Sequence, residues 1–457
     1  MILMIKRTLK QIQEMVNGCG LAKEFEDIVV SGVVIDSRKI EKGNLFIPII
    51  GERVNGHSFA QDAVNGKGAK ATFWQADQPD MPADIPVIVV ENTEKALQQL
   101  AIAYKNDLNM KVVGITGSNG KTSTKDILAS ILATSYKVHK TPGNFNSEFG
   151  MPITLLMAPV DTEIAVLEMG MAGLGQIKLL SDLAKPDVSV ITCIGEAHIE
   201  ELGSRENISI AKFEITSGLS KDGLFVYHGD EPLLKERLAE VNHEFELVTF
   251  GDEANNDYFP TSIRVDGSGM IFTIPQTDIT FNLSVLGKHN VMNALAAIAV
   301  ARDFGVTFAN IKKGLANVEM SKRRMEIFHT KNGLMVIDDT YNSSPTSVRA
   351  TLDLLYSLTG FNQKIVVLAD MLELGEHETA YHEEIGACID PNEIDILLAY
   401  GPLAKNITDK SKVNLTQHFD DKIALAKKLE SLSSNKDVCL IKGSLGMAMD
   451  DVVNELK

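Results

Sequence analysis

The sequence predicts an α/β protein of several domains, and three observations support this prediction. The chain has 457 residues, too many for one ordinary domain, so about two to four domains are expected. Largely apolar runs alternate with helical patterns, as in buried parallel strands that helices connect. A glycine-rich turn, Gly114–Thr122, lies between one such strand and one such helix. These features predict a parallel sheet of the P-loop ATPase type at the centre of the chain.

The first block, residues 1–105, contains short strands and helices. Strands are expected at Val33–Ile35 and at Leu45–Ile47, the second after the turn Lys42–Asn44. The helical stretch Ala96–Tyr104 closes the block. We expect a separate N-terminal domain here.

The second block, residues 106–318, opens with an apolar strand at Val112 and Val113. The apolar runs that predict further buried parallel strands are Ile164–Leu167, Val188–Ile191 and Leu224–Tyr227. From about residue 250 to 285 apolar and polar residues alternate, which indicates antiparallel strands. The alanine-rich stretch Val291–Ala301 is then expected to be helical.

The third block, residues 319–457, begins the alternation of strands and helices again. Its predicted strands are Met335–Ile337, Ile365–Leu368, Ile396–Ala399 and Val438–Ile441. Helical patterns lie between them. This block is therefore expected to form a second doubly wound α/β unit.

The turn Gly114-Ile-Thr-Gly-Ser-Asn-Gly-Lys-Thr122 has the composition of a phosphate-binding loop. Backbone N–H groups of the turn and of the following helix N-terminus favour anionic oxygens. Lys121 adds a positive charge, and the Thr122 hydroxyl is suited to Mg²⁺. The spacing departs from G-x-x-x-x-G-K-[ST], because Ile115 stands where the first glycine belongs.

The overall composition excludes several classes of protein. Lys and Arg number 44 against 61 Asp and Glu, a net charge of −17, which argues against non-specific nucleic-acid binding. The four cysteines are scattered, as expected for thiols of a reduced cytoplasm. The apolar run at Met1–Ile5 is too short for a signal peptide, and no segment has the length of a membrane span. We expect a cytoplasmic protein without membrane insertion.

Three polar residues follow the predicted strands of the second block. Glu168 ends a strand, where α/β sheets bind ligands, so it is a candidate Mg²⁺ ligand beside Thr122. His198 follows the next strand in the same way, although a loop histidine without a metal is the commoner case. Lys212 lies on a helical stretch and, judged alone, is an ordinary surface lysine.

Other polar segments have an ordinary interpretation beside a functional one. Arg323-Arg324 and Asp338-Asp339 are ambiguous alone, since an arginine suits phosphoryl charge and a strand-end aspartate suits a ribose or a metal. Asp36-Ser-Arg38, Thr141–Gly150, Gly287–Asn290 and Tyr341–Pro345 are equally consistent with turn chemistry.

Taken in order, however, these residues resemble the Mur ligases, ATP-dependent amide-forming enzymes of peptidoglycan precursor synthesis. The resemblance covers essentially the whole chain. It is carried by Thr116–Thr122, Glu168, the Gly-x-Ala-His198 loop, Ala211-Lys212, Gly-x-His-Asn290-x-x-Asn293 and Asp338-Asp339. Within the family, the resemblance is greatest to members that join D-alanyl-D-alanine to UDP-N-acetylmuramoyl-tripeptide. That is indicated by Asp36-Ser-Arg38, Asn144-Phe-Asn146, Asp339–Pro345, Ala369–Gly375 and Lys442-Gly-Ser444.

The resemblance implies three domains: an N-terminal domain that binds the UDP-sugar, a central domain that binds ATP, and a C-terminal Rossmann-like ligase domain. It also implies roles for single residues. The implied ATP contacts are Gly117, Ser118, Asn119, Gly120, Lys121, Thr122, Asn290 on the adenine, Arg324 on the γ-phosphoryl group and Asp339 on the ribose. Thr122 and Glu168 are implied to hold one Mg²⁺, and His198 with Lys212, as a carbamate, a second. Lys121, His198, Lys212 and Arg324 are the implied catalytic residues. The implied substrate contacts are Ser37, Arg38, Thr141, Asn144, Asn146, Tyr341 and Asn342.

The implied reaction passes through an acyl phosphate and gives the UDP-MurNAc-pentapeptide, ADP and phosphate. A monomer is expected. Cys193 stands where the family commonly has Asn, and Leu445 where it usually has Arg. The alternatives are a P-loop kinase or NTPase switch, which needs no amine, and a non-catalytic nucleotide-binding scaffold.

Overall fold

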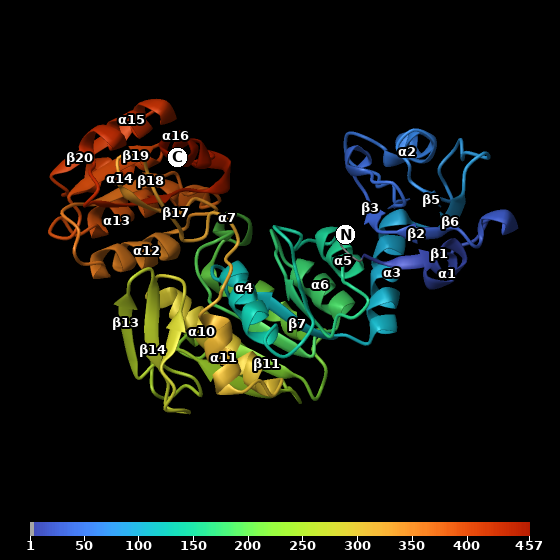
Figure 1. Ribbon diagram of the computed structural model, residues 1–457, viewed down its shortest axis with the longest axis horizontal. Helices are drawn as coiled ribbons and strands as arrows, with labels where there is room; N and C mark the ends of the chain where they lie inside the picture. Colours follow the sequence, from blue (N-terminus) through green and yellow to red (C-terminus); the bar gives the residue numbers. More distant parts are fainter. Residues whose placement is uncertain (1–3) are drawn as a thin grey trace.

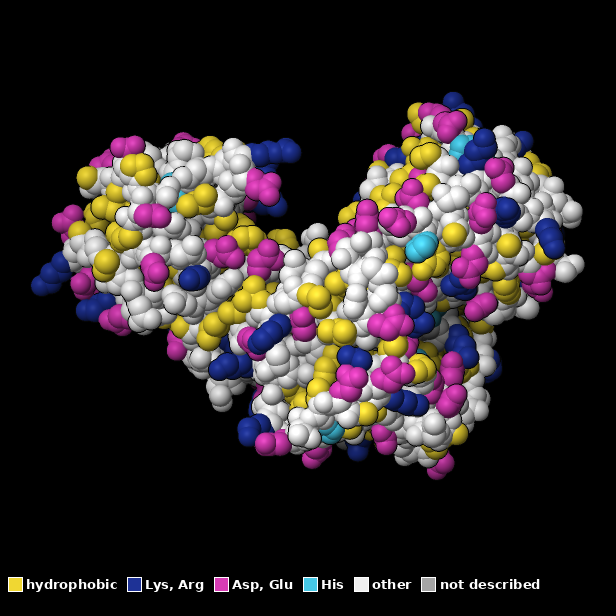
Figure 2. Space-filling view, turned by 180° about the vertical axis from the view of Figure 1, so that it is seen from behind, with side chains coloured by type: hydrophobic (Ala, Val, Ile, Leu, Met, Phe, Trp, Pro, Cys, Tyr) yellow, Lys and Arg dark blue, Asp and Glu magenta, His cyan; other side chains and the backbone are white. Residues whose placement is uncertain are grey.

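The computed structural model describes residues 4–457; Met1–Leu3, part of the stretch considered as a leader, lie outside the described residues. The N-terminal elements and the C-terminal elements occupy opposite ends of the long axis (Figure 1). The central sheet lies between and below them. From the opposite side, the surface is notched between the two terminal lobes, and acidic side chains are spread over that face without gathering (Figure 2).

The N-terminal elements form two small sheets. One is the antiparallel pair β1–β2, and the other is parallel, in the order β3-β4-β5-β6. The last helix of this N-terminal part, α3, leads directly to β7, the first strand of the central sheet. The elements are β1 (Lys6–Thr8), α1 (Leu9–Met15), β2 (Val29–Ser31), β3 (Val33–Val34), β4 (Leu45–Phe46), α2 (Ala60–Asn65), β5 (Ala71–Gln75), β6 (Val87–Val90) and α3 (Thr93–Leu108).

The central sheet is six-stranded and parallel, in the order β12-β11-β10-β7-β9-β8. Because β7 lies between β9 and β10, the carboxyl ends of these three strands meet at one edge. The elements are β7 (Lys111–Thr116), α4 (Lys121–Leu132), β8 (Val138–Lys140), α5 (Gly150–Leu156), β9 (Ile164–Glu168), α6 (Gln176–Ala184), β10 (Val188–Ile191), α7 (Ile199–Leu202), α8 (Arg205–Phe213), β11 (Leu224–His228), α9 (Pro232–Glu240) and β12 (Glu246–Phe250).

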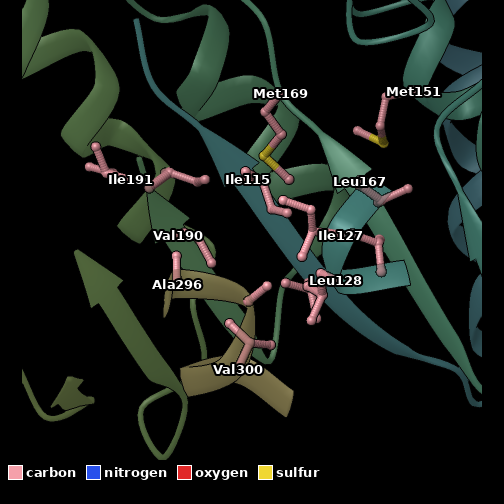
Figure 3. Close-up of a cluster of buried hydrophobic side chains, with 14 of the residues drawn as sticks. Ile115, Ile127, Leu128, Met151, Leu167, Met169, Val190, Ile191, Ala296 and Val300 are labelled. Carbon is pink, nitrogen blue, oxygen red and sulfur yellow. The ribbon is translucent and has the colours of Figure 1, made fainter. Parts of the chain in front are cut away.

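The core of this part is apolar and tightly packed. Ile127 and Leu128 of α4 meet Ile115 and Leu167 of the sheet, and Val300 of α10 approaches from the same side (Figure 3). All five of these side chains are fully buried. At about 1.5–3 kcal/mol for each buried aliphatic side chain, this packing holds α4, and thus the phosphate loop before it, against the sheet.

An antiparallel sheet, in the order β13-β14-β15, and two helices complete the central region. The elements are β13 (Ser262–Asp266), β14 (Gly269–Thr273), β15 (Phe281–Leu283), α10 (Lys288–Asp303) and α11 (Phe308–Leu315). Eleven residues of α10, among them Ala294–Ala301, are buried. Small side chains on this helix let it pack closely against its neighbours.

The C-terminal sheet has the order β16-β17-β21-β18-β19-β20, parallel except for β16. Helices lie on both sides, as in a doubly wound fold. The elements are β16 (Glu326–His329), β17 (Met335–Asp339), α12 (Pro345–Ser357), β18 (Lys364–Ala369), α13 (Glu378–Cys388), β19 (Ile396–Tyr400), α14 (Ala404–Lys410), β20 (Leu415–Phe419), α15 (Lys422–Leu432), β21 (Val438–Lys442) and α16 (Asp450–Leu456).

The predicted mixed α/β class with parallel sheets is confirmed, and the named strands and helices are present with ends shifted by a few residues. The strands that were not among those expected are β1, β2, β5, β6, β8, β12, β16 and β20. In the stretch between residues 4 and 457, no helix is both long enough and apolar enough to cross a bilayer.

Candidate active site

Two neighbouring cavities open at the carboxyl edge of the central sheet. The first, of about 620 Å³, is lined by the phosphate loop, Glu168, His198, Lys212 and Arg324, among others. The second, of about 200 Å³, is lined by α10, α12 and the ends of β17 and β21. Asn119, Gly120, Arg324 and Asn342 line both, so the loop separates the two spaces.

Two glycines of the phosphate loop are required by its backbone. Gly117 has φ +150°, and a Cβ there would lie 1.9 Å from Thr192 Oγ1. Gly120 has φ +83°, and a Cβ would lie 2.5 Å from Asn293 Oδ1. The loop therefore passes between β10 and α10 where no side chain fits.

Ser118 and Asn119 connect the loop to other parts of the protein. The hydroxyl of Ser118 accepts a hydrogen bond from the Gly195 N–H at 2.9 Å. The Asn119 amide donates to Ser344 Oγ at 3.2 Å, just before α12. The loop thus touches both the strand-end loop of β10 and the C-terminal part.

Lys121 opens α4 and lies over the loop. Its Nζ donates to the Gly117 carbonyl at 2.6 Å. Burial lowers the pKa of Lys121, and nearby Arg324 lowers it further, while Glu168 opposes both effects. The positive charges of Lys121 and Arg324 make this end of the cavity suited to an anion.

Thr122 and Glu168 meet at the carboxyl ends of β7 and β9. The Thr122 hydroxyl donates to Glu168 Oε2 at 2.9 Å, and the Asn146 amide donates to Glu168 Oε1 at 2.9 Å. Thr141 is fully buried and lies beneath, where its hydroxyl accepts the Glu168 N–H at 2.9 Å. Thr141 therefore positions Glu168 from below.

His198 and Lys212 line the same cavity from the β10 side. His198 Nδ1 lies 3.0 Å from Glu373 Oε2 of the C-terminal part. Lys212 is only 1% exposed, and burial, together with the charge of Lys121, holds its pKa well below the usual value. A buried lysine with this depressed pKa differs from the surface lysine that its sequence position alone favoured.

Arg324 enters the cavity from the segment that follows α11. Its Nη2 donates to Thr122 Oγ1 at 3.3 Å, and its guanidinium carbon lies 4.0 Å from the centre of the Tyr341 ring. Its Nε is buried and has no hydrogen-bond partner among residues 4–457. A buried donor left free in this way is suited to an anionic ligand.

The second cavity brings Asn290 and Asp339 together. Asn290 Nδ2 donates to the Leu286 carbonyl at 2.8 Å, and its Oδ1 accepts from Asn293 at 3.0 Å. Asp339 Oδ2 forms an ion pair with Lys442 Nζ at 2.5 Å; the two residues are register partners at the carboxyl ends of β17 and β21. This pairing gives the cavity a fixed polar wall.

The structure brings most of the sequence-predicted residues to these cavities, but Ser37, Arg38, Asn144 and the buried Thr141, all predicted to contact the substrate, line neither of them. Ser37 and Arg38 lie in the N-terminal part. Arg38 pairs with Asp36, Nε to Oδ1 at 2.9 Å, and this arginine lowers the pKa of Asp36 to about 2. Asn144 is exposed, whereas Asn146, Tyr341 and Asn342 line the first cavity.

Sequence reasoning did not single out His289, Lys442 or Glu373 as site residues. Lys442 follows the predicted strand Val438–Ile441, and its position beside Asp339 depends on β21 pairing with β17, which the sequence does not show. His289 precedes Asn290 in a polar segment. Nothing in the sequence around Glu373 indicates a site residue, because its contact with His198 forms only when the central and C-terminal parts meet.

Comparison with known proteins agrees with this geometry. Residues 29–105 match the Mur ligase family catalytic domain, residues 115–301 the Mur ligase middle domain, and residues 323–445 the Mur ligase glutamate ligase domain. The UDP-N-acetylmuramoyl-tripeptide–D-alanyl-D-alanine ligase of Bacillus subtilis is 45% identical over 457 residues, 99% of each chain.

Solved structures give the same result. MurF from Acinetobacter baumannii superposes with a TM-score of 0.88 at 29% identity, covering 100% of this chain and 99% of that one. The MurF ligase of Thermotoga maritima in complex with ADP gives a TM-score of 0.83 at 31% identity, covering 93% of this chain and 96% of that one. With three domain matches in order and relatives matched end to end, the chain belongs to the Mur ligase family.

Proposed function

We propose that this Mur ligase uses ATP to join D-alanyl-D-alanine to UDP-N-acetylmuramoyl-tripeptide, with release of the UDP-MurNAc-pentapeptide, ADP and phosphate. The names of the full-length relatives support the choice of substrates. The observation that carries the proposal is the first cavity. There Thr122, Glu168 and Lys121 face Arg324, which belongs to a different part of the chain.

ATP is proposed to span both cavities. Its adenine would lie at Asn290, its ribose at Asp339, and its phosphates on residues 117–122. The position of the loop between the two cavities supports this orientation. We propose a division into residues 1–105, 106–318 and 319–457, with Ser37, Arg38, Asn144 and Asn146 on the UDP-muramoyl-peptide side.

The donor set at the carboxyl ends of β7 and β9 fits Mg²⁺. The Thr122 hydroxyl and the Glu168 carboxylate are oxygen donors, the kind that Mg²⁺ prefers, and they lie 2.9 Å apart. His198 and a modified Lys212 would hold the second ion. When bound, the two ions would supply positive charge beside the phosphoryl oxygens.

Lys212 is proposed to carry a carbamate. An ammonium group does not bind a cation, whereas a carbamate presents carboxylate-like oxygens. The neutral amine adds to CO₂ and loses a proton, and burial beside Lys121 favours that neutral form. The modification also places a negative charge beside the positive charge of Lys121.

The proposed reaction has two steps. The terminal carboxylate of the tripeptide attacks the γ-phosphorus, forming an acyl phosphate as the bond to the ADP oxygen breaks. The dipeptide amine then attacks the acyl carbon, loses a proton, and phosphate leaves. Lys121 and Arg324 would stabilise charge on the transferred phosphoryl group.

A coupled assay of phosphate release tests the proposal against a kinase or NTPase. Release should require ATP, the UDP-muramoyl-tripeptide and D-alanyl-D-alanine together. Omitting D-alanyl-D-alanine should reduce steady release to the background rate. Sustained release from ATP alone would exclude the ligase and favour an NTPase, while ATP binding without any release would favour a scaffold.

A further inference from the structure

One face of α4 carries polar residues that contact the segment between α11 and β16. Thr122, Asp126 and Ser130 are spaced four residues apart, so their side chains share this face. Ser130 Oγ donates to the carbonyls of Gly314 at 2.8 Å and Asn317 at 3.2 Å. The start of the segment is therefore fastened to the third turn of α4.

Asp126 fastens the middle of the segment. Its Oδ2 accepts two hydrogen bonds from Ser321, from the backbone N–H at 2.9 Å and from Oγ at 2.7 Å. Its Oδ1 lies 2.6 Å from Lys140 Nζ and 3.5 Å from Lys125 Nζ. The Asp126 side chain is 0% exposed, so both contacts with Ser321 are charge-assisted bonds shielded from water.

Thr122 meets the end of the segment, where Arg324 lies 3.3 Å away. On either side of Arg324, Arg323 and Met325 have left-handed backbones, with φ +60° and +54°. Such conformations cost about 1–2 kcal/mol in a residue with a side chain. Arg323 is in turn held by Asp450 of α16 at 2.5 Å. Lys322 is thus the residue between the anchor at Ser321 and the anchor that Asp450 provides at Arg323, and Arg324 follows the second anchor directly.

We propose that Asp126 is a positioning residue for the reaction: by holding Ser321 on α4, it delivers Arg324 to the phosphate end of the site. The inference rests on the proposed role of Arg324 in ATP-dependent ligation. The same helix carries Thr122 and Asp126, so the phosphate loop and the anchor move as one body. The buried Nε of Arg324 is then presented at a fixed distance from the loop.

The test is a double-mutant cycle. Ser321→Ala removes one bond to Asp126 and keeps the backbone one; Asp126→Ala removes both. Each should lower kcat about 10-fold while KM for ATP changes less than about 3-fold, because misplacing a catalytic group affects the transition state more than binding. In an Arg324→Ala background both substitutions should have less than about a 2-fold effect, since the group that they position is absent.

Two matched variants complete the test. Ser130→Ala removes the neighbouring anchor on the same face of α4 and should leave kcat within about 2-fold, and Ser321→Thr should restore the rate lost in Ser321→Ala. An unchanged kcat in Ser321→Ala, or an equal loss with and without Arg324, would overturn the inference. Full activity of Arg324→Ala would instead overturn the role of Arg324 in the proposed function. If Asp126→Ala does not fold, Ser321→Ala decides alone.

Discussion

Single residues of this site owe their chemistry to burial. Lys212 is an unremarkable residue in the sequence, yet it is 1% exposed in the fold and lies in one cavity with Glu168 and His198. Desolvation destabilises its charged form. At the residue scale, the environment and not the residue type decides what Lys212 does.

Lys212→Ala should therefore lose activity by about 100-fold or more, the cost of removing one strong electrostatic contributor. Acetate or formate should restore part of the rate by occupying the place of the carbamate. Initial rates of phosphate release, with and without the added carboxylate, measure this. Lys178→Ala, at an exposed lysine of α6, is the control. A Lys212→Ala enzyme with normal activity would refute the carbamate.

His289 makes the stability of the protein depend on pH. Burial lowers its pKa to about 4 from 6.5, with Lys442 lowering it and Asp339 opposing. The unfolded chain binds a proton near pH 6.5, whereas the folded protein resists it until about pH 4. The free energy of unfolding should thus be highest above pH 6.5 and fall by about 3 kcal/mol between pH 6.5 and 4.

Urea unfolding of the wild type and of His289→Gln at pH 7, 5.5 and 4 checks this expectation. The variant should show a smaller loss of stability across that range. The comparison with His329→Gln, on the exposed end of β16, controls for general acid effects. Equal pH profiles for the wild type and His289→Gln would contradict the assignment.

At the scale of elements, the unit β7–loop–α4 explains why sequence reasoning succeeded best here. The strand, the glycines and the helix are contiguous, so their geometry is encoded locally. Gly117 and Gly120 occupy backbone conformations and spaces that exclude other residues. A local motif of this kind is predictable without knowledge of the rest of the chain.

Gly117→Ala should weaken nucleotide binding, because its Cβ would lie 1.9 Å from Thr192 Oγ1 and the loop must shift. Affinity for a non-hydrolysable ATP analogue, measured by calorimetry, should fall by about 10-fold or more, as for other losses of precise positioning. Gly173→Ala is the matched control, since no atom lies within 4 Å of its added Cβ. Unaltered affinity in Gly117→Ala would show that the loop adapts.

Several of the strands that sequence reasoning missed lie at an edge of their sheet, whereas β5 is an inner strand whose five residues are all buried. β12, β16 and β20 lie at sheet edges, where one side of each strand is exposed and apolar runs are short or mixed with polar residues. Glu246–Phe250 and Leu415–Phe419 show this pattern. Edge strands are specified by their neighbours in the sheet more than by their own composition.

At the scale of the whole molecule, the central and C-terminal parts are in direct contact. Glu196 Oε2 accepts the Thr346 N–H at 3.2 Å and its hydroxyl at 2.6 Å, a carboxylate at the N-terminus of α12 supplied from the other part of the chain. Asn119 with Ser344, and His198 with Glu373, add to this interface. The structure is thus closed between these two parts.

Glu196→Gln should weaken closure by about 1–2 kcal/mol, since a charge-assisted bond at a helix N-terminus becomes a neutral one. Spin labels at exposed Lys235 of α9 and Lys405 of α14 should then give a broader distance distribution. The exposed thiols Cys19 and Cys388 must first be replaced by serine. Thr346→Ser, which keeps the hydroxyl, is the control, and identical distributions for all forms would exclude Glu196 as a closure contact.

The sequence by itself determined the α/β class, the phosphate loop and the family. It also identified Glu168, His198, Lys212, Asn290, Arg324 and Asp339 as candidates, because motifs preserve residue type and spacing along the chain. Their proposed roles came from resemblance, since a lone Lys212 or Arg324 carries no local signal.

Only the tertiary structure decided which of these residues meet. Thr122 and Glu168 lie 46 residues apart, and Thr122 and Arg324 lie 202 apart. The pairing of β7 with β9 brings the first pair together, and the packing of the segment after α11 on α4 brings the second. The burial of Lys212, the pair Asp339–Lys442 and the attachment of Ser321 to Asp126 depend on contacts between distant segments. Such contacts arise when distant segments of the chain pack together, so they cannot be predicted from the order of residues along the chain.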